Sequence, residues 1–393
     1  MEIEDFQDFQ DFAKRDIYKF AREHQDEDTA RLLLSASRYP SIDMPAAVQQ
    51  IEGLRAAREK WPSLLACEEF LYPPRLNREQ SSSETTARYK VESVKWMVAS
   101  VADLTGGMGI DTLAFAKVAE QVDYVELDPQ LCALMERNLR ALGVTNVNVH
   151  CADSMEWLST AERYDVLFID PARRDNYGRK VAGFEDCTPN ILDHMGLLRT
   201  HSQRLMVKAS PMIDIDMACS QLGVVEEVHV VEYGGECKEV LFVCGEPEGE
   251  PRIYCGNHCF TRREEAVAEV VLCESVGRYL YEPDAALMKA GPYRSIGGWY
   301  GVALLGRNTH LYTSDNLIKG FPGRCFEVLQ ELKLDRKAVA DVIPDGKAHV
   351  VTRNYPVAAA DLQRQLGLKE GGEAFVIATT VGIRRCGFLC VRK

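Results

Sequence analysis

Apolar runs and amphipathic stretches alternate along the middle of the chain, from about residue 98 to residue 244. Short, valine-rich runs separated by stretches long enough for a helix are typical of a parallel sheet with crossover helices. We expect strands at 98–104, 124–127, 147–151, 166–169, 204–208, 225–231 and 239–244. The last two are separated only by Tyr233-Gly-Gly235 and its neighbours, so they should form an antiparallel hairpin. The pattern predicts an α/β, Rossmann-like sheet of seven strands that ends in this hairpin.

The first 75 residues predict helices. Apolar side chains recur at helical spacing in two runs, from Phe6 to Phe20 and from Ile51 to Trp61. A linker should follow, because the prolines of Tyr72-Pro-Pro-Arg75 cannot stand inside a helix. Ser81-Ser-Ser-Glu84 then supplies a cap and a first-turn acid for a further helix. We therefore expect an N-terminal helical domain over 1–75 and the domain of the sheet over 76–249.

The carboxyl third predicts two smaller domains. Gly245-Glu-Pro-Glu-Gly-Glu-Pro251 has the composition of a linker. Beyond it we expect helices at 274–281, 283–289, 336–342 and 358–366, and strands at 301–305, 310–313, 326–329, 348–352 and 373–379. Pro322-Gly323 makes a further break. The prediction is therefore two small α/β domains, over 250–321 and 322–393.

The composition indicates the cellular environment of the protein and says less about its fold. No window holds about 18 uninterrupted apolar residues, so a membrane partner is not expected. The acidic amino terminus lacks a signal-peptide pattern, and we expect a cytoplasmic protein. The 13 cysteines are scattered as buried hydrophobes would be. Cys255-Gly-Asn-His258-Cys259 lacks the second ligand pair of a structural zinc site, so we expect no metal.

Charge is distributed unevenly along the chain. The net charge is −13, and residues 91–249 alone carry −13, whereas residues 1–90 carry −4 and residues 250–393 carry +4. The chain ends with two basic pairs, Arg384-Arg385 and Arg392-Lys393. A solvated surface and an RNA-binding face both fit this mildly basic end.

A glycine-rich turn follows the first predicted strand, in the sequence Asp103-Leu-Thr-Gly-Gly-Met-Gly109. Backbone without Cβ turns tightly and lets a ligand approach closely. The spacing differs from the Gly-x-Gly-x-x-Gly of dinucleotide enzymes, and we interpret the turn as a site for S-adenosylmethionine (SAM). Asp103 either binds the amino group of SAM or organises the turn. Thr105, Gly106, Gly107 and Gly109 would line the cofactor.

Two further acids follow the next two strands. Glu126 ends the second strand, where its two oxygens match the two ribose hydroxyls. Asp153 follows the third strand and either accepts from the adenine amino group or is an ordinary loop acid. Asp128 precedes Pro129, so it should cap a helix over Pro129–Leu142 that Gly143 ends.

The fourth strand ends in Asp170-Pro-Ala-Arg-Arg174, at the position that faces the methyl donor in such sheets. An Asp-Pro-Pro-aromatic sequence here is typical of enzymes that methylate planar nitrogens, whose acid and backbone carbonyl accept from the amine. Asp170 and Pro171 fit this pattern, whereas Ala172 and Arg173 replace the second proline and the aromatic residue. We assign these four residues to catalysis. Arg173 and Arg174 either bind a base or a phosphate, or pair with acids of this domain.

The residues at the end of the fifth strand indicate whether methyl transfer could use a covalent intermediate on a cysteine. Asp-Pro-x-Arg also occurs in enzymes that methylate pyrimidine C5 in RNA, and these require a cysteine nucleophile near this position. The chain has Val207-Lys-Ala-Ser-Pro211 there, with no cysteine, which disfavours that route. Lys208 either contacts substrate or pairs with an acid.

The chain resembles, over nearly its whole length, bacterial class I SAM-dependent methyltransferases with carboxyl-terminal ferredoxin-like and THUMP-like domains. The resemblance rests on the segments Leu76–Lys90, Asp103–Asp111, Asp170–Arg174 and Val351–Gly372. It implies SAM as the cofactor. The Ser-Glu-Thr-Thr-Ala segment is similar to one that packs over the cofactor in cap-guanosine N2 methyltransferases. That similarity implies that Gln80, Ser82 and Thr86 close the SAM pocket.

The same resemblance implies an RNA substrate, tRNA or rRNA, because THUMP domains recognise tRNA ends; Arg384 and Arg385 are then candidate RNA-binding residues. Our leading hypothesis is methyl transfer to a base nitrogen of RNA, guanine N2 or adenine. A second hypothesis is a SAM-dependent methyltransferase for a small molecule or protein, which the net acidity and the Ala172 and Arg173 departures favour. A third is a non-catalytic module that binds SAM or RNA. The sequence leaves the oligomeric state open.

Overall fold

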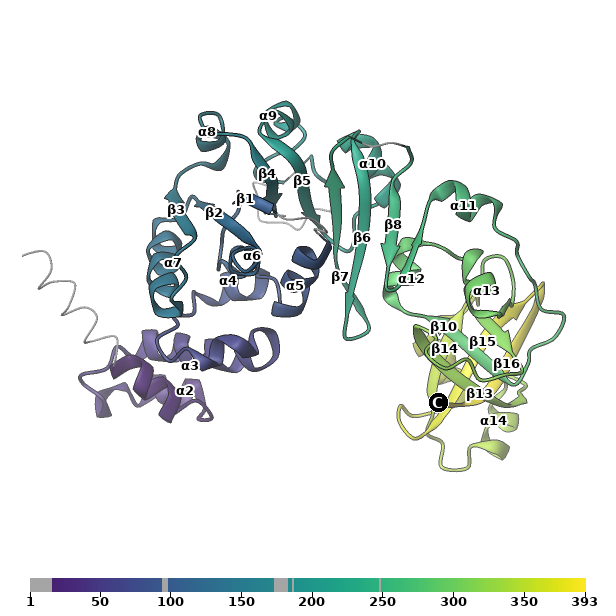
Figure 1. Cartoon of the computed structure of the whole chain (residues 1–393). Helices are drawn as coiled ribbons and strands as arrows, with labels where there is room; N and C mark the ends of the chain where they lie inside the picture. The colour runs from purple at the N-terminus through teal and green to yellow at the C-terminus, as the bar shows by residue number, and fades with distance from the viewer. Residues whose placement is uncertain (1–15, 94–97, 173–182, 186, 247–248) are drawn as a thin grey trace, which may run out of the picture. The chain divides into compact units, whose positions relative to one another are not determined.

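The computed structural model describes residues 16–93, 98–172, 183–185, 187–246 and 249–393 (Figure 1). The chain forms two compact units. The first comprises Met1–Val225 and Leu241–Glu246, and the second comprises Glu226–Val240 and Pro247–Lys393. Arg173 and Arg174 lie outside the described residues.

The first unit begins with helices, as the apolar spacing predicts. Residues 16–23 are helical, and α2 (Thr29–Leu34), η1 (Ala36–Arg38), α3 (Met44–Lys60), η2 (Pro62–Ala66), α4 (Arg75–Gln80) and α5 (Glu84–Ser93) follow. Ile51, Leu54 and Trp61 of this layer share one buried core with Met108 and Ile110, which lie at the end of the glycine-rich turn. The helical layer is therefore part of the support of that turn.

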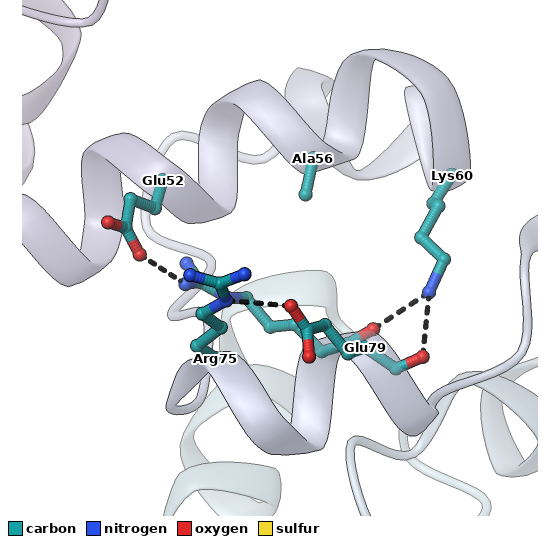
Figure 2. A pocket seen from close by; sticks show the side chains of 6 residues that line it. Glu52, Ala56, Lys60, Arg75 and Glu79 are labelled. Carbon is teal, nitrogen blue, oxygen red and sulfur yellow. Dashed lines mark hydrogen bonds and ion pairs between the residues drawn. The ribbon is translucent and has the colours of Figure 1, made fainter.

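The groove between α3 and α4 is lined by charged side chains (Figure 2). Lys60 donates to the backbone oxygens of Arg78 and Ser81, at 2.8 and 3.2 Å. Arg78 is buried and pairs with Glu52 at 2.8 Å. Since Lys60 holds the last turn of α4, the helical layer fixes the chain just before Ser82.

The central sheet contains β1 (Val98–Asp103), β2 (Ala119–Glu126), β3 (Val147–Cys151), β4 (Tyr164–Ile169), β5 (Ser202–Ala209), β6 (Val225–Tyr233), β7 (Glu236–Cys244), β8 (Arg252–Cys255) and β9 (His258–Phe260). The strand order is β3-β2-β1-β4-β5-β7-β6-β8-β9, and β1 to β5 pair in parallel. The connecting helices are α6 (Ile110–Phe115), α7 (Pro129–Leu142), α8 (Ser154–Leu158), α9 (Met195–Thr200) and α10 (Ile215–Leu222). All seven predicted strands are confirmed. The sheet has two more, because β8 pairs in parallel with β6 and β9 pairs with β8.

The helix predicted from capping signals is confirmed at both ends. Asp128 accepts a hydrogen bond from the backbone of Gln130 at the start of α7, and Gly143 ends the helix in a left-handed conformation, with φ +68°. A glycine adopts this conformation without steric cost.

The second sheet lies in the second unit and has the order β11-β12-β10-β13-β16-β15-β14. Its strands are β10 (Tyr279–Pro283), β11 (Ala303–Leu304), β12 (Tyr312–Ser314), β13 (Gly323–Glu331), β14 (His349–Arg353), β15 (Ala374–Val381) and β16 (Arg384–Arg392), and its unit also holds α11 (Arg262–Val267), α12 (Ala285–Ala290), α13 (Ser295–Tyr300), α14 (Arg336–Val342) and α15 (Ala359–Leu366). The prediction of a helix at 274–281 is wrong. Tyr279–Pro283 is a strand that is buried at every position and pairs on both sides, so it shows no alternation.

The described part of the chain lacks a membrane-spanning helix and a metal-binding cluster. It contains no helix that is both long and apolar enough to span a membrane. It also contains no cluster of three or more histidine, cysteine or acidic side chains arranged to hold a metal ion.

Gly106 offers a test of the packing beneath the turn. A Cβ at this position would lie 2.1 Å from the Tyr124 ring, so Gly106→Ala should lower the free energy of unfolding by about 1–3 kcal/mol. Denaturant titration measures this. Gly196→Ala is the matched control, because its Cβ would meet nothing within 4 Å, and it should leave stability unchanged or slightly higher. Equal stability of the two variants would contradict the packing.

Candidate active site

The glycine-rich turn is held by hydrogen bonds to the neighbouring strand β2. The Gly106 amide donates to the Val125 oxygen at 3.0 Å, and the Gly107 amide donates to Glu126 Oε2 at 2.9 Å. The Tyr124 hydroxyl donates to the Gly107 oxygen at 2.7 Å. Gly109 has a φ of +80°, and a Cβ there would lie 2.5 Å from Met135 Sδ. The turn is therefore closely packed where Gly106 faces Tyr124 and Gly109 faces Met135. Gly107 lies on its open side, because a Cβ there would meet only one atom within 4 Å, at 3.8 Å.

Asp103 organises this turn. Its Oδ1 accepts from the Thr105 amide at 3.1 Å and its Oδ2 accepts from the Thr112 hydroxyl at 2.6 Å. Burial raises its pKa to about 7, against the two hydrogen bonds, and Asp111 and Asp170 add to the increase. Of the two roles expected for Asp103, these contacts correspond to organisation of the turn.

Glu126 and Asp153 lie at the same edge of the sheet, because parallel strands end together there. Glu126 accepts from the amides of Gly107 and Asp128, both at 2.9 Å, so each oxygen keeps a second lone pair for a ligand. Asp153 caps α8, and Met155 and Glu156 both donate to its Oδ1, which leaves Oδ2 out of the cap. Leu127, which sequence reasoning missed, exposes 68% of its surface beside Glu126.

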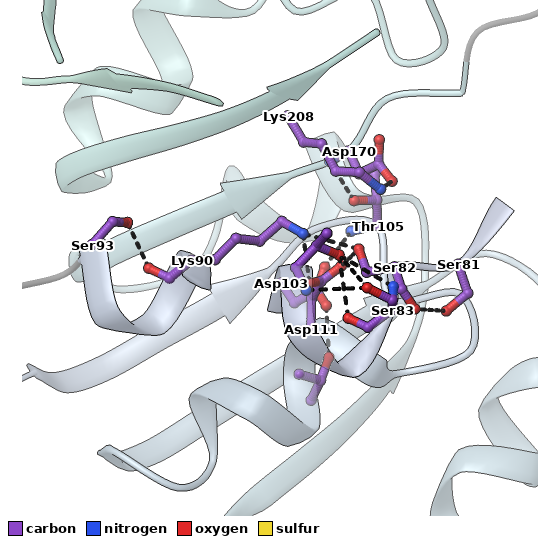
Figure 3. A network of polar contacts seen from close by, with 12 residues as sticks. Ser81, Ser82, Ser83, Lys90, Ser93, Asp103, Thr105, Asp111, Asp170 and Lys208 are labelled. Atoms are coloured by element: carbon purple, nitrogen blue, oxygen red, sulfur yellow. Dashed lines mark hydrogen bonds and ion pairs between the residues drawn. The ribbon is translucent and has the colours of Figure 1, made fainter. Parts of the chain in front are cut away.

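Asp170 lies just after β4, and two contacts orient it (Figure 3). Its amide donates to the Thr105 hydroxyl at 2.7 Å, which joins it to the glycine-rich turn. Its Oδ2 accepts from Lys208 Nζ at 2.5 Å. Lys208 is buried, so of its two expected roles the structure shows the ion pair with an acid.

Ala172 differs from expectation in one respect. Its amide donates to the Thr188 oxygen at 2.8 Å, and its own oxygen accepts from the Thr188 amide at 3.0 Å. The Ala172 carbonyl already accepts one hydrogen bond in this bridge, whereas the Pro171 carbonyl accepts none among the described contacts, so Pro171 is the better candidate to accept from a substrate amine.

The segment Ser81–Ser83, called the strap here, lies against the start of α6 (Figure 3). Ser82 is buried and donates to Asp111 Oδ2 at 2.7 Å. Thr86 is also buried, and its hydroxyl accepts from the Ser83 amide at 3.1 Å. Gln80 is exposed at the end of α4. These contacts fix the strap but leave open which of its side chains would touch a ligand.

Lys90 and Asp111 are two site residues that sequence reasoning missed. Lys90 is fully buried and pairs with Asp111 Oδ1 at 3.0 Å. Burial opposes ionisation of Asp111, but Lys90, Lys208 and the Ser82 hydroxyl together outweigh it and lower the pKa of Asp111. Both residues end motifs on which the family resemblance rests, which was the available signal.

Arg384 and Arg385 lie in the second unit, at the start of β16. Both are exposed, and Arg384 Nη1 pairs with Glu331 Oε1 at 2.6 Å. Part of the positive charge at this end of the chain is therefore balanced within its own unit.

The residues at this edge fit SAM. Glu126 has free acceptor capacity for two hydroxyls, and the open side of Gly107 allows close approach of a ligand. Leu127 offers exposed apolar surface for a base. Asp103, Glu126 and Asp153 have no lysine among their described hydrogen-bond partners, whereas Asp111 and Asp170 are paired with Lys90 and Lys208, so the unpaired acids favour a cationic ligand when they are ionised.

Comparisons with known proteins agree with this geometry. Residues 279–322 match a model of a ferredoxin-like domain, and residues 323–392 match a model of a THUMP-like domain. An uncharacterized SAM-dependent methyltransferase of Mycobacterium tuberculosis is 26% identical over 309 residues, which are 77% of this chain and 83% of that protein. The crystal structure of a methyltransferase from Porphyromonas gingivalis W83 has a TM-score of 0.83 and 29% identity, and the match covers 96% of this chain and 97% of that one.

A more distant relative covers part of the chain. The 23S rRNA (uracil(1939)-C(5))-methyltransferase RlmD of Aeromonas salmonicida is 29% identical over 154 residues, which are 37% of this chain and 29% of that protein.

The pKa of Asp103 predicts a pH dependence of SAM binding. Since that pKa is about 7, Asp103 is largely protonated below pH 7, and a cationic ligand favours its ionised form. SAM affinity should therefore rise with pH up to 7, by at most about tenfold per unit. It should fall again above about pH 8, where an α-amino group loses its proton. Calorimetry across pH 5.5–9 checks this.

Asp103→Asn is the control for this titration. Its affinity should be lower but independent of pH between 5.5 and 7. A wild-type affinity that is equally flat over this range would contradict the assignment of the titration to Asp103.

The sheet, the glycine-rich turn, the acids at its edge and the two relatives that match most of the chain all support the same conclusion. The cofactor is SAM, and the helices and sheets carry the expected class I arrangement. The protein is a SAM-dependent methyltransferase that ends in a ferredoxin-like and a THUMP-like domain.

Proposed function

We propose that the protein transfers a methyl group from SAM to a base nitrogen of RNA, either guanine N2 or adenine. The observation that carries the proposal is the orientation of Asp170. Lys208 holds its Oδ2 and Thr105 holds its amide, so Oδ1 is left to accept from a planar amine. The side chain of Asp170 is 23% exposed, so an acceptor in solution reaches it.

The reaction requires positioning more than acid–base strength. Bound SAM would supply a methyl group on a positively charged sulfur. The amine nitrogen would attack the methyl carbon in line, the carbon–sulfur bond would break to leave a neutral thioether, and the methylated nitrogen would then release a proton. Asp170 Oδ1 and the Pro171 carbonyl would each accept one N–H of the amine, which directs the nitrogen lone pair at the methyl group. The negative charge of Asp170 also stabilises the positive charge that develops on the nitrogen. The buried ammonium of Lys208 keeps the carboxylate in this orientation.

Support for RNA as the substrate comes from two findings. The chain ends in a THUMP-like domain, and its partial relative RlmD acts on 23S rRNA. The carboxyl third is also the one region with net positive charge, at +4 over residues 250–393. Arg385 is exposed there and would contact phosphate.

One observation favours methylation of a pyrimidine carbon as a second candidate. Cys187 lines the same small cavity as Pro171, Lys208 and Ala209, although no cysteine follows β5 directly. RlmD, the partial relative, methylates uracil C5. In this case the Cys187 thiolate would add to C6 of the base and leave again when the C5 proton is removed. Cys187→Ser would then abolish transfer, whereas nitrogen methylation would not need the thiol.

Labelled SAM tests the substrate class. We expect label from the methyl group to enter RNA isolated from cells that lack this gene, where the target is still unmodified. Digestion to nucleosides should give an N-methylated guanosine or adenosine, whereas 5-methyluridine would favour the Cys187 route. Label that enters only protein or metabolites would overturn the RNA proposal. Bound SAM without transfer to any of the three would favour a non-catalytic module.

Asp170→Ala tests the role of the acceptor-side carboxylate. Transfer should fall by about 10²–10⁴-fold, because the group that orients the amine is lost. SAM affinity should stay within about twofold, since the cofactor contacts remain. Single-turnover transfer and calorimetry measure the two quantities separately.

Glu162→Ala is the matched control, because Glu162 is an exposed acid at the opposite end of β4. It should change neither transfer nor affinity. If Asp170→Ala lost affinity and transfer in equal proportion, Asp170 would be a cofactor residue and the proposed role would be wrong.

A further inference from the structure

We propose that Lys90 is a positioning residue of the cofactor site, which pins the strap Ser81–Ser83 to Asp111 and so holds the glycine-rich turn ready for SAM. The proposal rests on SAM binding and not on the identity of the methyl acceptor. It concerns a contact between segments of this chain.

The side chains of Lys90, Ser82 and Asp111 form a closed triangle of polar contacts. Lys90 Nζ donates to Ser82 Oγ at 2.9 Å and pairs with Asp111 Oδ1 at 3.0 Å. Ser82 Oγ in turn donates to Asp111 Oδ2 at 2.7 Å. Figure 3 shows the Lys90 side chain extending from α5 toward the other two residues. One ammonium therefore joins α5, the strap and the first turn of α6.

Because these three side chains are buried, their contacts tolerate little displacement. The Lys90 side chain has no exposed surface and that of Asp111 has 11%. A buried ion pair is tolerated only when good geometry and further hydrogen bonds compensate the loss of hydration. Lys90 also lies over the Phe168 ring of β4, 5.8 Å from its centroid, which leaves it little freedom to move. Any displacement of the strap would thus leave a buried charge poorly solvated.

The strap is held from its other side as well. Trp61 is buried and its Nε1 donates to the Ser82 oxygen at 2.7 Å, while Lys60 donates to the Ser81 oxygen. The helical layer and Lys90 therefore hold the backbone and the hydroxyl of the same serine.

Asp111 links this arrangement to the cofactor turn. It stands two residues after Gly109, in the first turn of α6, and Thr112 beside it donates to Asp103. Asp111 is thus fixed to the strap, and Thr112 next to it is fixed to the turn. Lys90 acts on SAM binding through this connection and does not touch the cofactor.

A pair of variants separates positioning from stability. Lys90→Met leaves Asp111 buried without its ion pair and should reduce both stability and SAM affinity. Lys90→Met with Asp111→Leu replaces the pair by apolar side chains, which is often neutral for stability. We expect this double variant to unfold within a few degrees of wild type, yet to bind SAM at least roughly tenfold more weakly, because the strap has lost its charged hydrogen bonds.

Hydrogen exchange and kinetics provide readouts besides affinity. In the double variant without SAM, the amides of residues 82–86 should exchange faster than in wild type. At saturating SAM the rate of transfer should stay within about twofold, so that the effect falls on binding. Since affinity and exchange need no methyl acceptor, they remain decisive even if the RNA proposal fails.

Two further variants complete the test. Ser82→Ala removes only the hydroxyl of the triangle and should raise exchange in the strap without unfolding the protein. Ser93→Ala is the control for the loss of a buried serine hydroxyl. Ser93 lies in α5, the helix of Lys90, and among the described contacts its hydroxyl bonds only to the Lys90 backbone oxygen. Recovery of full SAM affinity by the double variant along with its stability would overturn the proposal. Unchanged exchange in Ser82→Ala would do so too.

Discussion

The site depends on the mutual neutralisation of buried charges at the carboxyl edge of a parallel sheet. Lys90 and Lys208 have almost no contact with water, and they stand against Asp103, Asp111 and Asp170. Buried charges must be paired and hydrogen-bonded, so each pair fixes the segments from which its partners come. Lys90 fixes the strap to α6, and Lys208 fixes Asp170 to β5. The same electrostatic requirement therefore holds both the segment beside the glycine-rich turn and the acid that is proposed to contact the methyl acceptor.

The N-terminal helices also contribute to this arrangement, because they support the strap and the glycine-rich turn. They share their core with Met108 and Ile110, and Trp61 and Lys60 hold the strap from behind. The helical layer is thus a support for the cofactor turn. The second unit, with its ferredoxin-like and THUMP-like domains, contributes no residue to the contacts described at this edge. Under the proposed function the second unit would serve the recognition of the substrate, and the first unit would perform the chemistry.

Much of the fold follows from local sequence signals, and the exceptions have physical reasons. The ends of α7 were predictable because Asp128, Pro129 and Gly143 each act on their own backbone. The strand β10 was not, because it is buried on both faces and its sequence shows no alternation. Asp103, Glu126, Asp153 and Asp170 follow from their positions at the ends of strands, whereas Asp111, in the first turn of α6, does not. Lys90 does not, since a helical lysine is ordinarily solvated, and only the packing of α5 against α6 shows that this one is buried beside Asp111. The hydrogen bond that the Ala172 carbonyl accepts from Thr188 likewise depends on a contact sixteen residues away.

Methyl transfer at this site requires that cofactor and acceptor meet at a single edge of the sheet, and a crystal structure with the demethylated cofactor, S-adenosylhomocysteine, tests this most directly. It should show the ribose hydroxyls on Glu126, the base beside Leu127 and Asp153, and the sulfur facing Asp170 and Pro171. The Lys90–Asp111 pair should be unmoved relative to the unliganded protein. A cofactor bound elsewhere, or a sulfur directed away from Asp170, would contradict the account.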